Sequence, residues 1–465
     1  MVSVVCLSAL LSGGCGASWK GFRPIQASSD LPSFRYSQVK SDSSKEERTD
    51  SSNVPDLSIP QGREEGPSPD LSSDSPSDHY SVGAVLPLTG KYRAYGERVM
   101  KALLLVFQMR ERHSPVTVEL VIEDGGDDVE QTERALRALM GRSDVVGIIG
   151  PLFSKTALPS AEIAQEARIP IIVLSQNPGV SQVGDYVFQH GLTYLRQAEA
   201  LADWAIDRGM KRFAVLYPAD PYGTQLAEAF WNRIETRGGQ IVGAESYAPA
   251  QTDFSEEIKA LVGLNLALSR VGERKLLEQI RKKMGVEGVA VKEENLSPIV
   301  DFEAIYIPDY PQAVGQIAPY LSYYNVSNVL LLGSNGWNSP DLVRRGERHV
   351  ENAVFIDGFS TQTDVSSARS FCTAYLSEFS LEDGSNGEPP GTLEAYAFEA
   401  LQMMMEGIRI REVNSRESLR YYLSSQDRFP GLLGPIRVSG ERDFFSPLVL
   451  LTVRDREIRQ LALLP

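Results

Sequence analysis

Four acidic side chains lie close together along the chain and raise the question of a metal site: Glu123, Asp124, Asp127 and Asp128. Carboxylates bind Ca²⁺, but a calcium-binding loop needs ligands at alternating positions, and this cluster lacks that spacing. Gly125 and Gly126 interrupt it, and an aspartate followed by Gln131 is typical of a helix start. The sequence therefore predicts a turn and a helix cap here, and no metal site.

Groups that carry catalysis are sparse in this sequence. The spacing typical of metal ligands is absent from the four histidines, His79, His113, His190 and His349. The chain has no G-x-S-x-G turn for a nucleophilic serine and no G-x-x-x-x-G-K loop for a phosphate. We therefore expect no enzymatic activity and no cofactor, and we interpret His190 as a structural residue.

Length and charge narrow the class of protein further. The 465 residues, 42% of them hydrophobic, are enough for two lobes with a sizeable core. Their formal net charge of -15 argues against nucleic-acid binding, which needs a basic surface. The three cysteines, Cys6, Cys15 and Cys372, are too few for a disulfide framework. Cys372 is expected in a helix as a small buried hydrophobe.

The first residues have the character of an export signal. Residues 1–11 are mostly apolar but too short to span a bilayer, and Ser12-Gly13-Gly14-Cys15 follows them. This pattern resembles a bacterial lipoprotein signal, which implies a lipid anchor on Cys15. Ordinary cleavage by signal peptidase and an uncleaved anchor are the alternatives. All three predict a location outside the cytoplasm, with residues 1–15 as the signal peptide.

Residues 16–80 are interpreted as a disordered tether. From about residue 26 this segment is dominated by Ser, Asp, Pro, Lys and Glu. Such a composition buries too little apolar surface to offset the entropy cost of folding.

The remainder alternates buried strands with helices. Residues 82–86 form an apolar run that meets Pro87 and Gly90 before a helical pattern, which predicts a strand, a loop and a helix. Further apolar runs suggest more strands, at 116–124, 145–150, 169–175, 212–217, 240–243, 304–308, 329–333 and 354–356. This alternation predicts an α/β fold with mostly parallel, doubly wound sheets. A charged helical insertion is expected at about 263–295, and a hairpin at 448–460.

Short motifs follow one another along the α/β part: Leu86-Pro87-Leu88-Thr89-Gly90 with Tyr95-Gly96, Ile149-Gly150-Pro151 with Ser154, Tyr222-Gly223, and Gly434-Pro435. In this order they resemble the type I periplasmic solute-binding proteins of the leucine/isoleucine/valine-binding kind. The similarity covers about residues 81–465. Within that family, the insertion and the segment 333–338 resemble the branch of penicillin-binding-protein activator lipoproteins.

The resemblance implies a two-lobed fold with three crossovers and a ligand cleft that closes by hinge bending. Lobe one would comprise residues 81–192 and 360–434, and lobe two residues 193–359 and 435–465. The crossovers are expected near His190–Thr193, Gly358–Thr361 and Gly434–Val438.

The family also implies where a ligand is held. In its amino-acid-binding members, hydroxyl and backbone N–H groups of lobe one bind the carboxylate of the ligand. The matching positions in this sequence are Ser154, Thr156, Ser175, Gln176 and Asn177. The helix that starts near Thr156 would add its free N–H groups and partial positive charge. The alternative for Ser154 is a helix-capping role.

Lobe two of the family contributes two tyrosines and an acidic residue that holds the ammonium group. Tyr222 and Tyr310 match the tyrosines, whereas Asn335 takes the acidic position. An amide carries no full charge, and removing one partner of a buried charge pair costs ~2–5 kcal/mol. We therefore expect tight binding of a free α-amino acid to be impaired.

Three functions remain open from the sequence, of which the third is a signalling or ligand-sensing receptor module. The first is an extracytoplasmic solute-binding protein that serves an ABC importer permease and holds an amino-acid-like or peptide-like ligand. The second is a lipid-anchored periplasmic activator or scaffold of a peptidoglycan synthase, which the charged insertion and the tether favour.

Overall fold

The computed structural model describes residues 79–109, 117–265, 297–379, 388–410 and 413–465, together with Val4–Cys6, 279 and 282–283. The rest of the expected signal peptide, Cys15 included, lies outside the described residues. So do the tether up to residue 78 and nearly all of the insertion beyond residue 265. His79 and Tyr80, expected at the end of the tether, belong instead to the first long strand.

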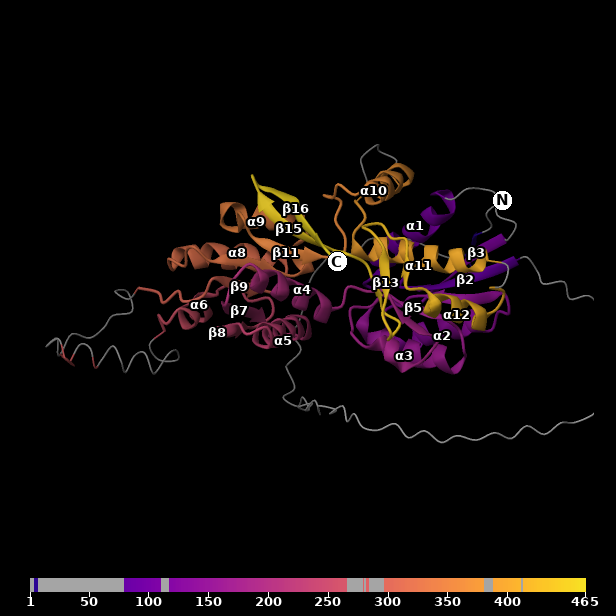
Figure 1. The fold of residues 1–465 in the computed structure, drawn as a ribbon, viewed down its shortest axis with the longest axis horizontal. Helices are drawn as coiled ribbons and strands as arrows, with labels where there is room; N and C mark the ends of the chain where they lie inside the picture. Colours follow the sequence, from indigo (N-terminus) through magenta and orange to yellow (C-terminus); the bar gives the residue numbers. More distant parts are fainter. Residues whose placement is uncertain are drawn as a thin grey trace, which may run out of the picture. The chain divides into compact units, whose positions relative to one another are not determined.

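The first sheet is parallel throughout and has the strand order β1-β3-β2-β4-β5-β6. Its strands are β1 (Val4–Cys6), β2 (His79–Leu86), β3 (Thr117–Asp124), β4 (Val145–Ile149), β5 (Ile171–Val173) and β6 (Val187–Gln189). Strand β1, which the sequence assigns to the signal peptide, pairs with β3 at the edge of this sheet. The parallel pairing confirms the predicted doubly wound arrangement (Figure 1).

Both faces of the first sheet are buried, as parallel sheets require. Val82, Ala84 and Leu86 of β2 join the larger core, which also contains residues of α1 (Arg93–Met109) and α11 (Thr392–Ile408). Val85 points to the opposite face and joins a separate core. That core is formed with α2 (Val129–Met140) and α3 (Ser154–Glu166). Alternation along one strand therefore places helices on both sides of the sheet.

The second sheet is mixed, with the order β16-β15-β11-β10-β9-β7-β8. Its parallel strands are β7 (Arg212–Pro218), β8 (Gln240–Tyr247), β9 (Ala304–Ile307), β10 (Leu330–Gly333) and β11 (Val354–Asp357). The hairpin predicted near the C-terminus is confirmed as β15 (Leu448–Arg454) and β16 (Glu457–Leu464). Strand β15 pairs antiparallel with β11, and β16 pairs antiparallel with β15 at the edge of the sheet.

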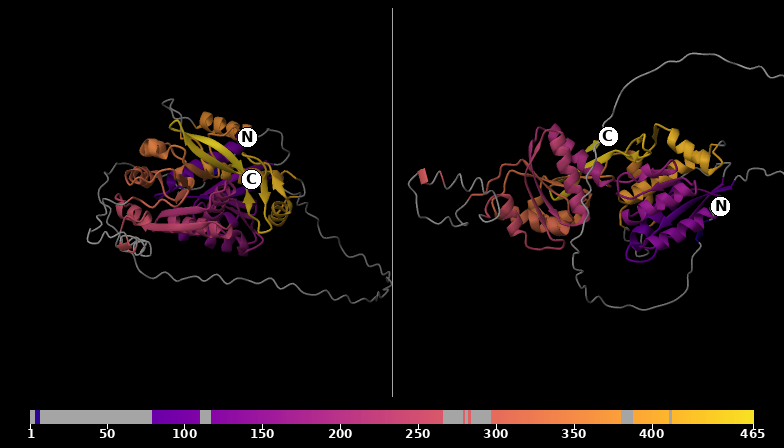
Figure 2. Two further views of the ribbon diagram at one scale, coloured as in Figure 1. Left: turned by 60° about the vertical axis from the view of Figure 1, so that its left-hand side comes forward. Right: turned by 90° about the horizontal axis from the view of Figure 1, so that it is seen from below.

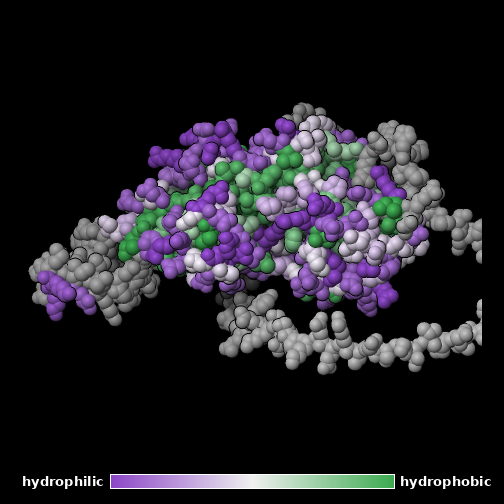
Figure 3. All heavy atoms as spheres, in the orientation of Figure 1, coloured by the Kyte–Doolittle hydropathy of each residue, from purple (hydrophilic) through white to green (hydrophobic). Residues whose placement is uncertain are grey.

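Helices pack in pairs on this second sheet. Helix α4 (Tyr194–Asp207) packs against α5 (Pro221–Thr236), and α8 (Pro311–Tyr323) against α9 (Pro340–Gly346) (Figure 2). A short helix α6 (Ser255–Leu261) packs on β8. Strand β16 is an edge strand whose apolar residues 461–464 are only half-buried. Hydrophobic residues are accordingly visible near β15 and β16 on the surface in Figure 3.

The remaining elements return to the first sheet. Helix α10 (Ser366–Glu378) packs on α1. Helix α12 (Arg416–Ser425) packs on α11 and β4. A small antiparallel sheet follows, made of β12 (Arg428–Phe429), β13 (Ile436–Val438) and β14 (Phe444–Phe445). Phe444 stacks on Phe188 of β6, with ring centroids 5.5 Å apart. Residues 435–445 therefore lie with the first sheet, and we propose the third crossover at 446–447 rather than at Gly434–Val438.

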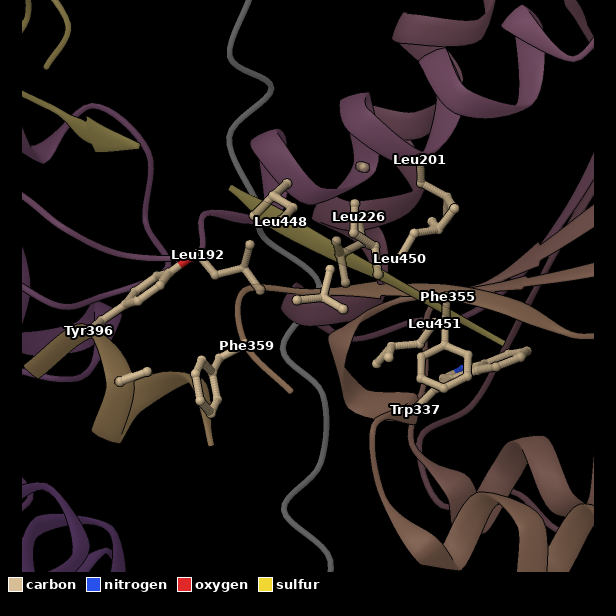
Figure 4. Packing of buried hydrophobic residues seen from close by; sticks show 14 of the residues in the cluster. Leu192, Leu201, Leu226, Trp337, Phe355, Phe359, Tyr396, Leu448, Leu450 and Leu451 are labelled. Atoms are coloured by element: carbon tan, nitrogen blue, oxygen red, sulfur yellow. The ribbon is translucent and has the colours of Figure 1, made fainter. Parts of the chain in front are cut away.

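Helix α11 contacts all three segments that join the sheets. Its Tyr396 stacks on His190, with ring centroids 4.4 Å apart, and its hydroxyl lies against Gly358. Its Glu399 is 1% exposed and accepts a hydrogen bond from Ser446 Oγ at 2.9 Å. Figure 4 shows the apolar side chains Leu192, Phe359 and Leu448 gathered beside Tyr396. The junction of the lobes is thus a packed core centred on one helix.

His190 and Glu399 form a buried pair within this junction. His190 Nε2 lies 2.8 Å from Glu399 Oε2, and His190 Nδ1 lies 3.1 Å from the carbonyl oxygen of Phe444. The other carboxylate oxygen of Glu399 accepts a hydrogen bond from the Leu432 N–H at 2.6 Å. These contacts give His190 a structural role at the first crossover.

A Tyr-Gly pair at the start of a helix recurs in both lobes. A Cβ atom on Gly96 would lie 2.1 Å from the Pro87 carbonyl oxygen, and one on Gly223 would lie 2.4 Å from that of Pro218. In each lobe, glycine therefore lets the helix approach the end of the preceding strand. This close approach explains the first and third motifs physically.

We expect Gly96→Ala to lower the free energy of unfolding by about 1–3 kcal/mol, because the backbone must shift to admit a methyl group. Urea denaturation measures this change. Gly141→Ala is the matched control, since its Cβ would meet nothing closer than 3.5 Å and its φ is -67°. Equal destabilisation by the two substitutions would contradict the close-approach explanation.

Candidate functional site

A cavity of about 510 Å³ opens at the carboxyl ends of β2 and β4. Most of its wall belongs to lobe one, and Pro221 at the start of α5 closes it from lobe two. Its lining includes the polar and aromatic residues Lys91, Tyr92, Asp127, Phe153, Ser154, Lys155 and Thr156. Its position agrees with the general rule that ligands bind beyond the carboxyl ends of parallel strands.

Ser154 and Thr156 both line this cavity at the first turn of α3. The N-cap of α3 is Phe153 and no side chain caps the helix, so Ser154 does not have the capping role considered for it. The Ser154 side chain is exposed, whereas Thr156 is buried and donates a hydrogen bond to the Phe153 carbonyl at 3.2 Å. A hydroxyl group and a helix N-terminus thus share one wall of the cavity.

Ser175, Gln176 and Asn177 follow β5 and lie beside this wall, although they are not part of the cavity lining described above. Asn177 Nδ2 donates a hydrogen bond to the Ser154 carbonyl at 3.4 Å, and Asn177 Oδ1 accepts one from Tyr194 at 3.1 Å. The carbonyl of Gln176 accepts from the Tyr194 N–H at 3.3 Å. Ser175 is fully buried, and within the described part of the chain its hydroxyl group has no hydrogen-bond partner.

Tyr222, Tyr310 and Asn335 come together in lobe two. The Tyr222 hydroxyl donates to Asn335 Oδ1 at 2.9 Å and lies 3.0 Å from Ser334 Oγ. The rings of Tyr222 and Tyr310 stack with centroids 5.2 Å apart. Burial raises the pKa of Tyr222, so this hydroxyl stays protonated and remains a donor at neutral pH.

Two residues around Asn335 escaped the sequence analysis. Gln197 Oε1 accepts a hydrogen bond from the Asn335 N–H at 3.1 Å, across 138 positions of sequence. Gly336 packs beneath the tyrosine pair, where a Cβ would lie 3.2 Å from Tyr310 Cδ1. In the sequence, the Gly-Ser-Asn-Gly composition was the one signal for this tight loop. No motif around Gln197 indicated its contact with Asn335.

An aromatic cluster on the lobe-one side was also missed. The rings of Tyr92 and Phe153 lie 4.3 Å apart, and Tyr95 packs edge-on to Phe153 at 6.2 Å. Tyr95 is 49% exposed, and Tyr310 on the other lobe is 51% exposed. After burial, interactions with Tyr95 and with acidic neighbours raise the pKa of Tyr310, so the two hydroxyls lie within electrostatic range. The spacing of Tyr92 and Tyr95 was the available sequence signal.

Two charged residues of the cavity wall, Lys91 and Asp127, contact neighbouring groups. Lys91 Nζ lies 4.6 Å from the centroid of the Tyr92 ring, and Asp127 accepts from the Lys91 N–H at 3.3 Å. The expected turn and cap are confirmed, because Asp128 is the N-cap of α2 and Asp124 accepts from the Leu88 N–H at 2.8 Å. Among residues that the structure describes, no group of three or more His, Cys, Asp or Glu could hold a metal ion.

Asp357 is a buried carboxyl at the second crossover, 6% exposed. It accepts hydrogen bonds from Thr392 Oγ1 at 2.6 Å and from Asn338 Nδ2 at 2.9 Å. Burial raises the pKa of Asp357 to about 6, although these hydrogen bonds oppose the shift. Desolvation therefore dominates over the surrounding donors.

Comparison with known proteins identifies the class. Residues 79–454 match the family model described as periplasmic binding protein, a class that implies an extracytoplasmic location. A Leu/Ile/Val-binding protein homolog of Brucella melitensis is 24% identical over 229 residues, 47% of this chain. The match spans 61% of that relative's own length, less than two thirds. No helix among the described segments is long and apolar enough to cross a membrane.

Solved structures share the two-lobed fold. A putative branched-chain amino acid ABC transporter protein from Rhodospirillum rubrum has a TM-score of 0.66 and 23% identity, covering 82% of this chain and all of its own. A solute-binding protein from Rhodopseudomonas palustris in complex with 3,4-dihydroxybenzoic acid has a TM-score of 0.60 and 18% identity, covering 83% of this chain and 97% of its own. At these identities the likeness establishes the fold alone.

The raised pKa of Asp357 predicts a pH dependence of stability. An unfolded aspartate titrates near ~3.9, so between about pH 4 and 6 the folded chain holds a proton that the unfolded chain has lost. As the pH rises from about 4 to about 6, the free energy of unfolding should therefore fall by about 2–3 kcal/mol because of Asp357. Asp357→Asn should remove that fall in urea denaturation measured from pH 4 to 7.

Asp144→Asn is the control of opposite sign. The hydrogen bond from Arg142 is the main reason that the pKa of Asp144 is lowered to about 2. Its contribution is present above about pH 4 and is lost as pH falls toward 2. This variant should lose stability at pH 7 and keep the fall between pH 4 and 6. An unchanged pH profile in Asp357→Asn would contradict the assignment.

Proposed function

Because the chain belongs to the periplasmic binding protein family, we propose that it is an extracytoplasmic solute-binding protein for an ABC importer. Its ligand is a small polar molecule, amino-acid-like or peptide-like, held in the cleft between the lobes. The protein binds and delivers this solute and does not transform it.

One observation carries this proposal: the cavity at the start of α3 has an exposed hydroxyl, an uncapped helix N-terminus and two lysines on its wall. Such a wall favours an anionic group, because the helix N-terminus and the ammonium groups both stabilise negative charge. A carboxylate is the anionic group that amino acids and peptides share. Ser154 and Thr156 are the proposed contacts, with Ser175, Gln176 and Asn177 supporting them from the next loop.

The remaining proposed ligand contacts come from lobe two. Tyr222, Tyr310 and Asn335 offer a stacked aromatic surface and a hydrogen-bonded amide. Closure about the three crossovers would bring this surface onto a ligand seated at α3. The family members named above are solute-binding proteins, which supports a permease as the partner. Lipidation at Cys15, with anchoring to a bacterial envelope membrane, belongs to the same proposal.

The alternative role, activation of a peptidoglycan synthase, rests on the insertion and the tether. Most of both segments lies outside the described residues, and the family match extends to the periplasmic binding proteins as a whole, not to the activator branch. Affinity capture from membranes distinguishes the two roles. Recovery of permease subunits supports the importer, whereas recovery of a peptidoglycan synthase alone supports the activator.

The importer proposal predicts that a small carboxylate stabilises the purified chain. A ligand at one hundred times its Kd adds about 2.7 kcal/mol to the free energy of unfolding. A thermal-shift screen of amino acids, short peptides, peptidoglycan fragments and organic acids should therefore raise the Tm with at least one compound. The absence of any shift across these classes would refute solute binding.

For the ligand so found, Tyr222→Phe should weaken binding roughly tenfold, because it removes the hydroxyl that positions Asn335. Isothermal titration calorimetry measures this loss. Tyr323→Phe is the matched control, since Tyr323 is 76% exposed at the far end of α8. An equal loss in both variants would show that the tyrosine pair is not part of the binding surface.

A further inference from the structure

We propose that the cleft is built for an aromatic carboxylate without an α-ammonium group, such as a benzoate or a phenylpropanoate. This inference rests on the proposed solute-binding function, and it assigns the cleft a carboxylate of another class than the amino-acid-like or peptide-like ligand proposed above. It follows from three features of the described residues: aromatic rings on both walls, cations at one end, and carboxylates already committed to other partners.

Aromatic rings face the cleft from both lobes. In lobe one, Tyr92 and Phe153 line the cavity and Tyr95 packs edge-on to both rings. In lobe two, the stacked pair of Tyr222 and Tyr310 begins directly after Pro221, the lining residue of that lobe. Tyr95 and Tyr310 are half-exposed before a ligand is bound, which is a large apolar area to leave in water. A planar ring between the two groups would cover both surfaces in offset or edge-to-face geometry.

The charge on the cavity wall suits an anion. Lys91 and Lys155 both line it, and Asp127 is the one acidic side chain of that lining. Lys155 is exposed in the first turn of α3, where its ammonium group adds to the helix N-terminus. One end of the cleft therefore provides a net positive site for a carboxylate.

The acidic side chains near the lobe-two tyrosines already accept hydrogen bonds from other groups of the protein. Asp220 caps α5 by accepting from the Gly223 N–H at 2.8 Å. Asp309 accepts from Tyr247 at 2.6 Å and from the Tyr310 N–H at 2.7 Å, and burial raises its pKa. Asp357 is held by Thr392 and Asn338.

The family resemblance assigns Asn335 to the position of the acid that holds an ammonium group, and an amide carries no full charge. The amide oxygen of Asn335 already accepts a hydrogen bond from the Tyr222 hydroxyl. Its backbone N–H donates one to Gln197 Oε1. An ammonium group placed here would lose water without gaining an ionic partner, which opposes binding of α-amino acids. A ligand with a ring and a carboxylate alone meets no such penalty.

The test compares ligands that differ in one group. The full chain is titrated by calorimetry with 3-phenylpropionate and L-phenylalanine, which share the ring and the carboxylate and differ in the α-ammonium. 4-Hydroxybenzoate and L-leucine are measured beside them. We expect an aromatic acid to bind at least tenfold more tightly than either amino acid.

Two outcomes separate this inference from the proposed function. Binding of L-leucine, L-phenylalanine or a peptide more tightly than the aromatic acids overturns the inference and leaves solute binding intact. Failure of every small carboxylate to bind overturns both.

Variants test the two contacts for the aromatic acid. Tyr310→Ala should weaken binding roughly tenfold and Tyr310→Phe should restore most of it, because the ring and not the hydroxyl makes the contact. Lys155→Gln should weaken binding and reduce its dependence on salt. Tyr323→Ala and Lys211→Gln, outside the cleft, are the controls. Unchanged affinity in both Tyr310→Ala and Lys155→Gln would refute the assignment.

Discussion

The burial of parallel strands on both faces is the constraint on which this molecule depends. Every residue of β4 is buried, and β2 sends alternate side chains into two separate cores. Helices must cover both faces, so a ligand can reach these strands only at their ends. The candidate contacts accordingly lie in the loops and first helical turns that follow β2, β4, β5, β7, β9 and β10. The requirement for a core thus decides where recognition takes place.

Close packing then sets which residues those loops contain. Glycine at 96 and at 223 lets a helix approach the proline carbonyl that ends each strand, and the tyrosine before it is left at the cleft. Gly336 has the same effect beneath Tyr222 and Tyr310. The aromatic walls on both lobes are therefore a by-product of how each strand is joined to its helix, and the two lobes share one construction.

Much of this was accessible from the sequence, because it was encoded locally. Apolar runs and glycine-containing loops predicted most strands of both sheets, but not β1 or β6, and the cap at Asp128 followed from the spacing to Gln131. What escaped prediction depends on contacts between distant segments. Gln197 contacts Asn335 within lobe two, and Phe444 packs on Phe188 of lobe one. The second contact is the reason that we propose the third crossover beyond Gly434–Val438. The contacts of Ser154 with a ligand, and the nature of that ligand, remain proposals.

The buried junction around α11 has a consequence for kinetics. Tyr396 and Glu399 lie one turn apart on that helix and together contact His190, Gly358 and Ser446, one residue in or beside each crossover. Because one helix contacts all three, we expect the crossovers to bend together, about a shared pivot at α11. We therefore expect packing at this pivot, which involves none of the proposed ligand contacts, to influence how long a solute stays bound. Release can be tuned there while the recognition surface stays as it is.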